Sequence, residues 1–153
     1  MKSTKKSFII QTDSHALEAE FSIPNNSNHR PCVILCSPSP KFGGDMQNTV
    51  LIQISSELNQ LGIASLKFNY RGVGNSTGET SNGSGELQDT IEVIKFIESI
   101  QEIDGSRIGI AGYSFGAWMA LDSSTKNQKV KSICSIACPQ NKLSLFSTLE
   151  IIQ

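Results

Sequence analysis

The sequence predicts an α/β fold in which a mostly parallel sheet carries helices on both faces and an antiparallel hairpin at its N-terminal edge. Short apolar runs typical of strands alternate with segments in which apolar residues recur at helical spacing. Such alternation is characteristic of a parallel sheet whose connections are helices. The first two strand-like segments instead flank a polar turn at residues 13–15, which favours a hairpin at the edge of the sheet.

Six strands follow from these patterns. They are residues 8–11, 17–23, 32–36, 63–70, 107–111 and 130–137. The run Cys-Val-Ile-Leu-Cys at 32–36 is apolar throughout, as expected for a strand buried on both faces. Asp104 and Gly105 are expected to form a turn before the strand at 107–111.

Helices are predicted between the later strands. Apolar residues at helical spacing mark the first two, at Met46, Val50, Ile54, Leu58 and Leu61 and at Leu87, Ile91, Ile94 and Ile97. Asp45 is expected to cap the start of the first helix, and Gly62 its end. A third helix is expected at 117–125, and Leu143, Phe146 and Leu149 are compatible with a short one in the tail.

Composition indicates one domain spanning residues 1–153 and excludes several kinds of partner. Thirteen basic and fourteen acidic side chains give a net charge of −1, which supplies no basic surface for nucleic acid or for anionic lipid. The lysine-rich start is followed by an apolar stretch of only residues 8–10, which is too short for an export signal. No run is long enough to span a membrane, so we expect a cytoplasmic protein.

The four cysteines form two pairs with equal spacing, Cys32 with Cys36 and Cys134 with Cys138. Zinc sites favour close pairs on tight turns, whereas these pairs lie in or at the end of strand-like runs. We therefore interpret all four as small buried hydrophobic residues and predict neither a metal nor a cofactor.

A serine motif dominates the second half of the chain. Residues 112–116, Gly-Tyr-Ser-Phe-Gly, match the pattern G-x-S-x-G between a predicted strand and a predicted helix. In this context the motif forms a sharp turn that projects the serine hydroxyl above the sheet. Gly112 and Gly116 are needed because side chains at those positions would collide with neighbouring backbone, and Ser114 becomes the candidate nucleophile.

Two glycine-rich loops add to this motif. In the first, Gly72, Gly74 and Gly78 follow a strand, but a dinucleotide fingerprint requires its third glycine at the position of Thr77. A loop that needs positive φ values is therefore favoured over nucleotide binding. The second loop, residues 37–45, joins a buried strand to a helix, as does the loop that supplies an oxyanion donor in hydrolases.

Together these segments resemble the α/β-hydrolase superfamily, in particular small bacterial-type serine hydrolases with the motifs Arg-Gly-x-Gly-x-Ser-x-Gly and G-x-S-x-G. The resemblance covers residues 8–138. It implies an eight-stranded fold of which about six strands are present, with Ser114 as the nucleophile. The backbone N–H groups of Phe115 and Ser39 would form the oxyanion hole, since Pro38 and Pro40 have no N–H to donate.

The chain departs from this family in two respects. Residues 37–40 read Ser-Pro-Ser-Pro where relatives have His-Pro-His-Pro, and the sequence stops before a seventh strand could be completed. The triad acid and histidine, which the resemblance places after the seventh and eighth strands, are therefore not in this chain. We expect a C-terminally truncated form in which Ser114 is positioned without being activated, inactive or very weak on its own.

Neither histidine of the sequence is expected to take over the role of the base. His29 precedes the strand at 32–36 and should lie at the opposite end of the sheet from Ser114, about 16 Å away. His15 lies in the predicted hairpin turn, and we interpret both histidines as solvated loop residues. Among the acids, Asp89 and Asp122 belong to helices, and Glu150 could approach the site only if the tail folds back.

Two functions remain open. One is a serine hydrolase that acts on a small-molecule acyl substrate (an ester, thioester or amide). The other is a non-catalytic binding chain, or a fragment that needs a complementing polypeptide. The second is suggested by the edge of the last strand, which would be unpaired and available for self-association.

Overall fold

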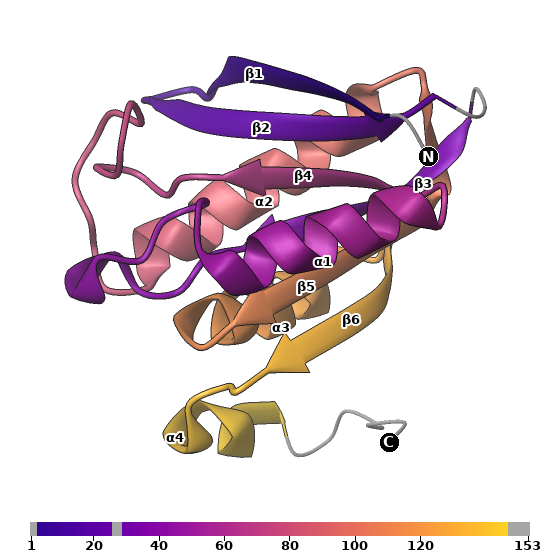
Figure 1. Cartoon of the computed structure of the whole chain (residues 1–153). Coiled ribbons are helices and arrows are strands. Elements are labelled where there is room, and N and C mark those ends of the chain that lie inside the picture. Colours follow the sequence, from indigo (N-terminus) through magenta and orange to yellow (C-terminus); the bar gives the residue numbers. More distant parts are fainter. Residues whose placement is uncertain (1–2, 26–28, 147–153) are drawn as a thin grey trace.

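A six-stranded sheet runs through the computed structural model, which describes residues 3–25 and 29–146 (Figure 1). The strands are β1 (Ser3–Gln11), β2 (Ala16–Pro24), β3 (Arg30–Cys36), β4 (Ala64–Phe68), β5 (Ile103–Tyr113) and β6 (Val130–Ile136). The helices are η1 (Pro40–Phe42), α1 (Thr49–Gln60), α2 (Ser84–Ser99), α3 (Phe115–Lys126), α4 (Gln140–Leu143) and η2 (Ser144–Phe146), of which η1 and η2 are 3-10 helices.

The sheet has the order β1-β2-β4-β3-β5-β6. β4, β3, β5 and β6 are parallel, whereas β2 is antiparallel both to β1 and to β4. One face carries α1, and α2 and α3 lie on the other (Figure 1). The predicted fold class, a mostly parallel sheet with an antiparallel N-terminal hairpin and helices on both faces, is confirmed.

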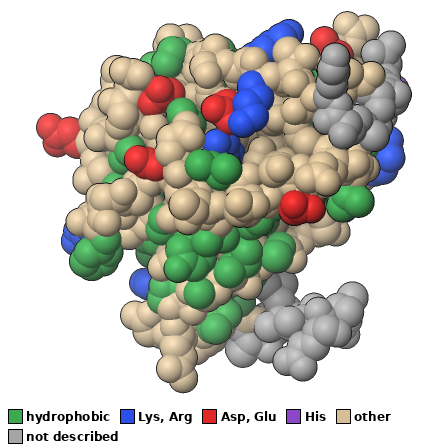
Figure 2. Space-filling model, in the orientation of Figure 1, with side chains coloured by type: hydrophobic (Ala, Val, Ile, Leu, Met, Phe, Trp, Pro, Cys, Tyr) green, Lys and Arg blue, Asp and Glu red, His purple; other side chains and the backbone are tan. Residues whose placement is uncertain are grey.

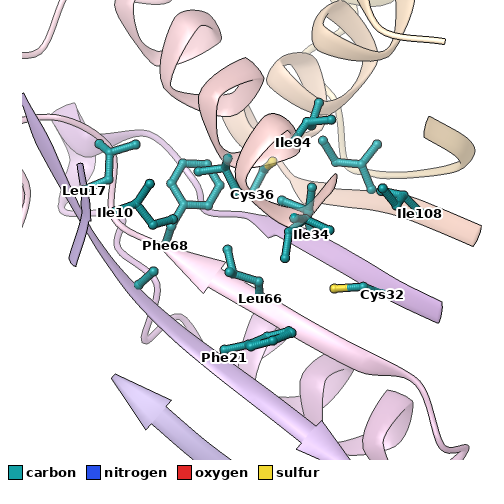
Figure 3. Packing of buried hydrophobic residues seen from close by; sticks show 14 of the residues in the cluster. Ile10, Leu17, Phe21, Cys32, Ile34, Cys36, Leu66, Phe68, Ile94 and Ile108 are labelled. Carbon is teal, nitrogen blue, oxygen red and sulfur yellow. The ribbon is translucent and has the colours of Figure 1, made fainter. Parts of the chain in front are cut away.

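The larger part of the core lies between the sheet and the helices α2 and α3. It contains Ile34, Phe68, Ile94 and Ile108, which pack together in Figure 3. A smaller cluster around Leu35, under α1, fills the opposite face. All five residues of β4 are buried, as expected for a central strand with a helix on each side.

The start of α1 differs from the prediction. The helix begins at Thr49 because the side chain of Asn48 accepts a hydrogen bond from the N–H of Val50 and caps it. Asp45 accepts from the N–H of Gln47 instead and belongs to a turn, and Met46 is buried outside the helix. The predicted end is correct, since Gly62 follows the helix with a φ of 79°.

The turn expected at Asp104 and Gly105 lies inside a strand, because β5 already begins at Ile103. The carboxylate of Asp104 accepts hydrogen bonds from Ser106 and Arg107 and so stabilises local contacts within the strand. In the tail, α4 and η2 occupy the region of the expected short helix, and Leu149 lies outside the described residues.

The cysteine prediction is correct for one pair only. Cys32 and Cys36 are fully buried, but Cys134 is exposed and Cys138 is half-buried. The reason is the position of β6, which is the outermost strand of the described sheet and has a strand neighbour on one side only. A strand-like pattern does not reveal this position, because an apolar run reads the same at the centre and at the edge.

The described helices cover only part of the face of the sheet that carries α1. Figure 2 shows hydrophobic side chains gathered over β5 and β6, beside α1. Five of the seven residues of β6 are exposed, among them Ile133 with 41% of its surface accessible. No helix among residues 3–25 and 29–146 is both long and apolar enough to cross a membrane.

Candidate active site

Ser114 occupies the turn between the end of β5 and the start of α3, where the motif predicted it. Its backbone has φ 56° and ψ −116°, a conformation that residues with a side chain rarely adopt. The N–H of Ser114 donates to the carbonyl of Ile136 at the end of β6, over 2.9 Å. The side chain is half-buried at the carboxyl edge of the parallel strands.

The two flanking glycines permit this turn. A Cβ atom at Gly112 would collide with the backbone of Gly116 and would lie 2.6 Å from the nitrogen of Ala117. A Cβ atom at Gly116 would collide with the carbonyl of Cys36 and would lie 2.5 Å from the carbonyl oxygen of Ser37. The first glycine thus lets the chain reverse, and the second lets α3 pack directly on the loop that follows β3.

This contact brings the second predicted loop to the serine turn. The carbonyl of Ser39 accepts from the N–H groups of Phe42 and Gly44 and so closes the loop into a tight turn. Ser39 and Phe115 line the same hollow. The assignment of their N–H groups as oxyanion donors remains a prediction.

The hollow has a volume of about 210 Å³ and is open to solvent on one side. Aromatic rings of Phe115 and Trp118 contribute to its wall, together with polar and charged side chains from three other segments. One of these is Glu86, which is almost completely buried and which the sequence analysis did not single out. Glu86 lies in the first turn of α2, just before the apolar residues that predicted this helix, and its position there carries no signal that it will face a site.

The glycine-rich loop after β4 matches the interpretation based on backbone geometry. Gly72, Gly74 and Gly78 have φ values of 72°, 55° and 86°. A carboxylate occupies the space where a phosphate would need to approach, because a Cβ atom at Gly74 would lie 2.5 Å from Glu18 Oε2. The N–H of Asn75 donates to Glu18 and lowers the pKa of that carboxyl, against the opposing effect of burial. A fixed negative charge at this point disfavours nucleotide binding.

His29 lies where it was expected. It precedes β3, whose last residue, Cys36, pairs with Gly112 of β5. His29 is therefore at the opposite end of the strands from Ser114, about 20 Å away along their direction. It is exposed, and its carbonyl accepts from the guanidinium of Arg107.

The interpretation of His15 as a solvated residue is wrong. Its side chain is only 7% exposed, and its Nε2 lies 2.7 Å from Oδ1 of Asp89, a fully buried carboxylate on α2. The same carboxylate accepts from the backbone N–H and the guanidinium of Arg71. The sequence gives no indication of this cluster, because 74 residues separate His15 from Asp89.

His15 still cannot act on Ser114. Because β2 is antiparallel to β4, the hairpin turn lies at the same edge of the sheet as the serine. Three steps between neighbouring strands nevertheless separate β2 from β5, which corresponds to about 14 Å. A general base needs hydrogen-bond distance from the proton that it removes, so neither histidine of the chain meets this requirement.

The remaining predicted acids are engaged elsewhere. Asp122 pairs with Lys126 on α3, and Asp104 pairs with Arg107 at the amino-terminal end of β5. Glu150 lies outside the described residues. Within the described parts of the chain, no three His, Cys, Asp or Glu side chains come together as a metal site would require.

Comparison with known structures gives the class of protein that this fold and serine turn define. A protein of unknown function from Agrobacterium tumefaciens, described as a proposed α/β hydrolase, is 31% identical with a TM-score of 0.84, covering 95% of this chain and 66% of that one. An alpha-beta serine hydrolase homologue from Coxiella burnetii is 34% identical with a TM-score of 0.75, covering 84% of this chain and 60% of that one.

The family follows from the sequence itself. Residues 13–144 match the family described as X-Pro dipeptidyl-peptidase (S15 family), and the chain belongs to this family within the α/β hydrolases. An uncharacterized protein of Rickettsia prowazekii is 30% identical over 120 residues, which are 78% of this chain and 50% of that protein. The chain thus spans about half the length of the curated relatives that it matches.

Proposed function

We propose that the protein is a serine hydrolase that forms an acyl-enzyme on Ser114 and acts on an ester, thioester or amide. The observation that carries this proposal is the backbone of Ser114, held at φ 56° between β5 and α3. Strain of this kind persists where the surrounding structure enforces it, as at the nucleophile turn of hydrolases. The Coxiella burnetii protein, described as a serine hydrolase homologue, supports the same chemistry.

The proposed reaction has two steps. The Ser114 oxygen attacks the substrate carbonyl while a base takes its proton, and the N–H groups of Phe115 and Ser39 stabilise the resulting oxyanion. The carbonyl re-forms, and the leaving group departs with the proton. Water then attacks the acyl-enzyme, giving its proton to the same base, and releases the acid and the free serine.

The base is the missing part of this scheme. Neither His15 nor His29 reaches Ser114, so we assign the histidine and its acid to polypeptide outside these 153 residues. A serine without a base is a poor nucleophile at neutral pH, because its hydroxyl stays protonated. Removal of triad members in serine proteases leaves a residual rate enhancement of about 10³–10⁴ over water. We therefore expect the chain alone to be inactive or very weak.

Chemical rescue tests the nucleophile. The chain is treated with a fluorophosphonate with and without imidazole, and the adduct is located by mass spectrometry. We expect slow labelling that imidazole accelerates, with the adduct on Ser114. Ser114→Ala should abolish this labelling, and Ser99→Ala, a change at an exposed serine on α2, should not affect it. An adduct rate that is equal in the wild type and in Ser114→Ala would rule out the proposal.

The family description suggests which amides to test first. X-Pro dipeptidyl-peptidases are described by the dipeptide that they release, so an X-Pro anilide is the natural amide substrate to compare with simple aryl esters. The comparison requires a form of the protein that contains the missing base, or imidazole in its place. Release of the amine from the anilide would extend the proposal from esters to peptides.

A second candidate function is a binding chain that associates through β6. The edge of β6 has no strand partner among the described residues, and hydrophobic side chains gather over β5 and β6 (Figure 2). An unpaired edge is a template for another strand, from a second copy or from a complementing polypeptide. Ile133→Lys should then reduce association measured by light scattering, and Ile9→Lys on the opposite outer strand, β1, should not. A wild-type chain that is monomeric at all concentrations tested would remove this candidate.

The expected partners and cellular compartment of the protein remain predictions. The near-balanced charge still argues against nucleic-acid and anionic-lipid partners, and the free cysteines are compatible with a reducing, cytoplasmic compartment. Fractionation of cells that express the native protein would test the compartment.

A further inference from the structure

We propose that the hollow lined by Ser39 and Phe115 binds a small carboxylate-bearing substrate, with Lys41 and Lys142 holding the carboxylate against an aromatic wall. Its catalytic meaning rests on the hydrolase function proposed above, since the hollow lies next to Phe115 and Ser39. Its ability to bind an anion does not depend on that function. Separate experiments therefore test anion binding and catalysis.

The aromatic wall is held in place by a series of ring contacts. Tyr70 meets Phe115 edge to face at 5.7 Å, and Phe115 meets Trp118 in the same geometry at 5.6 Å. Tyr70 is fully buried and packs in turn on Phe68 in the core. The rings that line the hollow are thus continuous with the core, which gives a ligand a rigid apolar surface.

Two cations from separate short helices line the same space. Lys41 comes from η1, two residues after Ser39, and Lys142 comes from α4, after β6. The Nζ of Lys142 lies 4.0 Å from the centre of the Trp118 ring. Neither lysine has an ion-pair partner among the described residues, so both charges are available to a ligand.

Glu86 is the one acidic side chain that lines the hollow among the residues that the structure describes, and its oxygens already accept hydrogen bonds. It accepts hydrogen bonds from the N–H groups of Ser81 and Gly83 and from the Ser81 hydroxyl. Burial would raise the pKa of Glu86, but these hydrogen bonds lower it below its ordinary value. Glu86 therefore stays ionised, and its single negative charge against the two lysines leaves the described wall with a net positive charge.

The size of the hollow limits the ligand. A volume of about 210 Å³ is below the roughly 300–1,000 Å³ typical of drug-sized sites, so a ligand of one ring or a short chain fits. Thr80 and Asn82 also line the hollow and offer further hydrogen bonds. The positive wall also disfavours a substrate whose ammonium group enters the hollow, as a dipeptide amine would. The charge of the wall therefore favours an acidic substrate over a dipeptide with a free amine, which the family description would suggest first.

Trp118 makes the test direct, because it is the one tryptophan in the sequence and lines the hollow. The full chain is titrated with benzoate, benzamide and benzylamine, which share one ring and differ in charge, and binding is followed by Trp118 fluorescence and by calorimetry. We expect benzoate to bind about tenfold or more tightly than benzamide, and benzylamine to bind most weakly, with an advantage for benzoate that shrinks at high salt.

Matched variants assign the effect to the two lysines. Lys41→Gln and Lys142→Gln should each weaken benzoate binding about threefold to fivefold and leave benzamide unchanged. Lys129→Gln, at an exposed lysine just before β6, should change neither. Equal affinities for benzoate and benzamide, tighter binding of benzylamine, or no saturable binding by either method would overturn the inference.

The result of the benzoate test can be told apart from the result of the phosphonate test of the proposed function. Benzoate preference in a chain whose Ser114 resists phosphonate even with imidazole would support the anion site and reject the hydrolase. Rescue of Ser114 labelling in a chain without benzoate preference would reject the anion site and keep the hydrolase.

Discussion

The imidazole of His15 lies 2.7 Å from the carboxylate of Asp89, and this contact ties the β1–β2 hairpin turn to α2. Asp89 also binds Arg71 through the guanidinium and the backbone, so one buried carboxylate fixes three segments at the carboxyl edge of the sheet. The hairpin is thereby part of the framework around the glycine-rich loop.

Loss of the Asp89 carboxylate should lower the stability of the fold. Asp89→Ala leaves the cation of Arg71 and the imidazole without their shared partner, and we expect it to lower the free energy of unfolding by about 3–5 kcal/mol. Asp122→Ala removes the exposed pair with Lys126 and should cost less than about 1 kcal/mol. Urea denaturation measures both, and similar losses for the two variants would contradict the structural role of Asp89.

Glu86 should make stability depend on pH. Its pKa is lowered in the folded protein, so its stabilising effect is fully present above its ordinary value of 4.5 and is lost as the pH falls through the folded value. Glu86→Gln should therefore be less stable than the wild type by about 1 kcal/mol at neutral pH, with the difference vanishing in acid. Thermal unfolding from neutral to acidic pH measures this difference. Glu57→Gln, at an exposed position on α1, is the matched control and should cost less than Glu86→Gln at neutral pH.

Gly116 should tolerate no side chain. A Cβ atom there meets the carbonyls of Cys36 and Ser37, and we expect Gly116→Ala to destabilise the fold by roughly 2–3 kcal/mol. It should also suppress imidazole-dependent labelling of Ser114, because the loop and α3 are pushed apart. Gly105→Ala, where a Cβ atom has no neighbour within 4 Å, should change stability by less than about 1 kcal/mol. Unaltered labelling and stability in Gly116→Ala would show that the contact is not as tight as described.

The four cysteines should react in a fixed order. Burial raises the pKa of Cys36 to about 12 and also raises the pKa of Cys32, so neither thiol is available at neutral pH. We expect iodoacetamide to modify the exposed Cys134 first and the half-buried Cys138 more slowly, as read by mass spectrometry. Cys134→Ser should remove the first adduct alone. Early modification of Cys32 or Cys36 in the folded chain would contradict their placement in the core.

Local patterns predicted the serine turn correctly because all its determinants lie within a few residues. A strand, two glycines and a helix surround Ser114, and each can be recognised from its immediate neighbours. The start of α1 was misjudged by the same kind of reasoning, since Asp45 and Asn48 are both good capping residues and the side chain of Asn48 caps the helix.

Features that depend on the order and pairing of the strands could not be predicted from the sequence. The exposure of Cys134 follows from the place of β6 in the sheet order, which no property of residues 130–136 reveals. The burial of His15 follows from β2 pairing with β4, which brings the hairpin turn beside α2. Lys142 reaches Trp118 only because α4 lies beyond the end of β6, at the edge of the sheet where α3 begins.

The backbone of Ser114 also bears on how mutation would act at this position. Glycine adopts a φ of 56° freely, whereas a serine held in such a sparsely populated region costs about 1–3 kcal/mol. Ser114→Gly should accordingly be more stable than the natural protein. The chain thus carries the hydroxyl of Ser114 at a cost in folding stability.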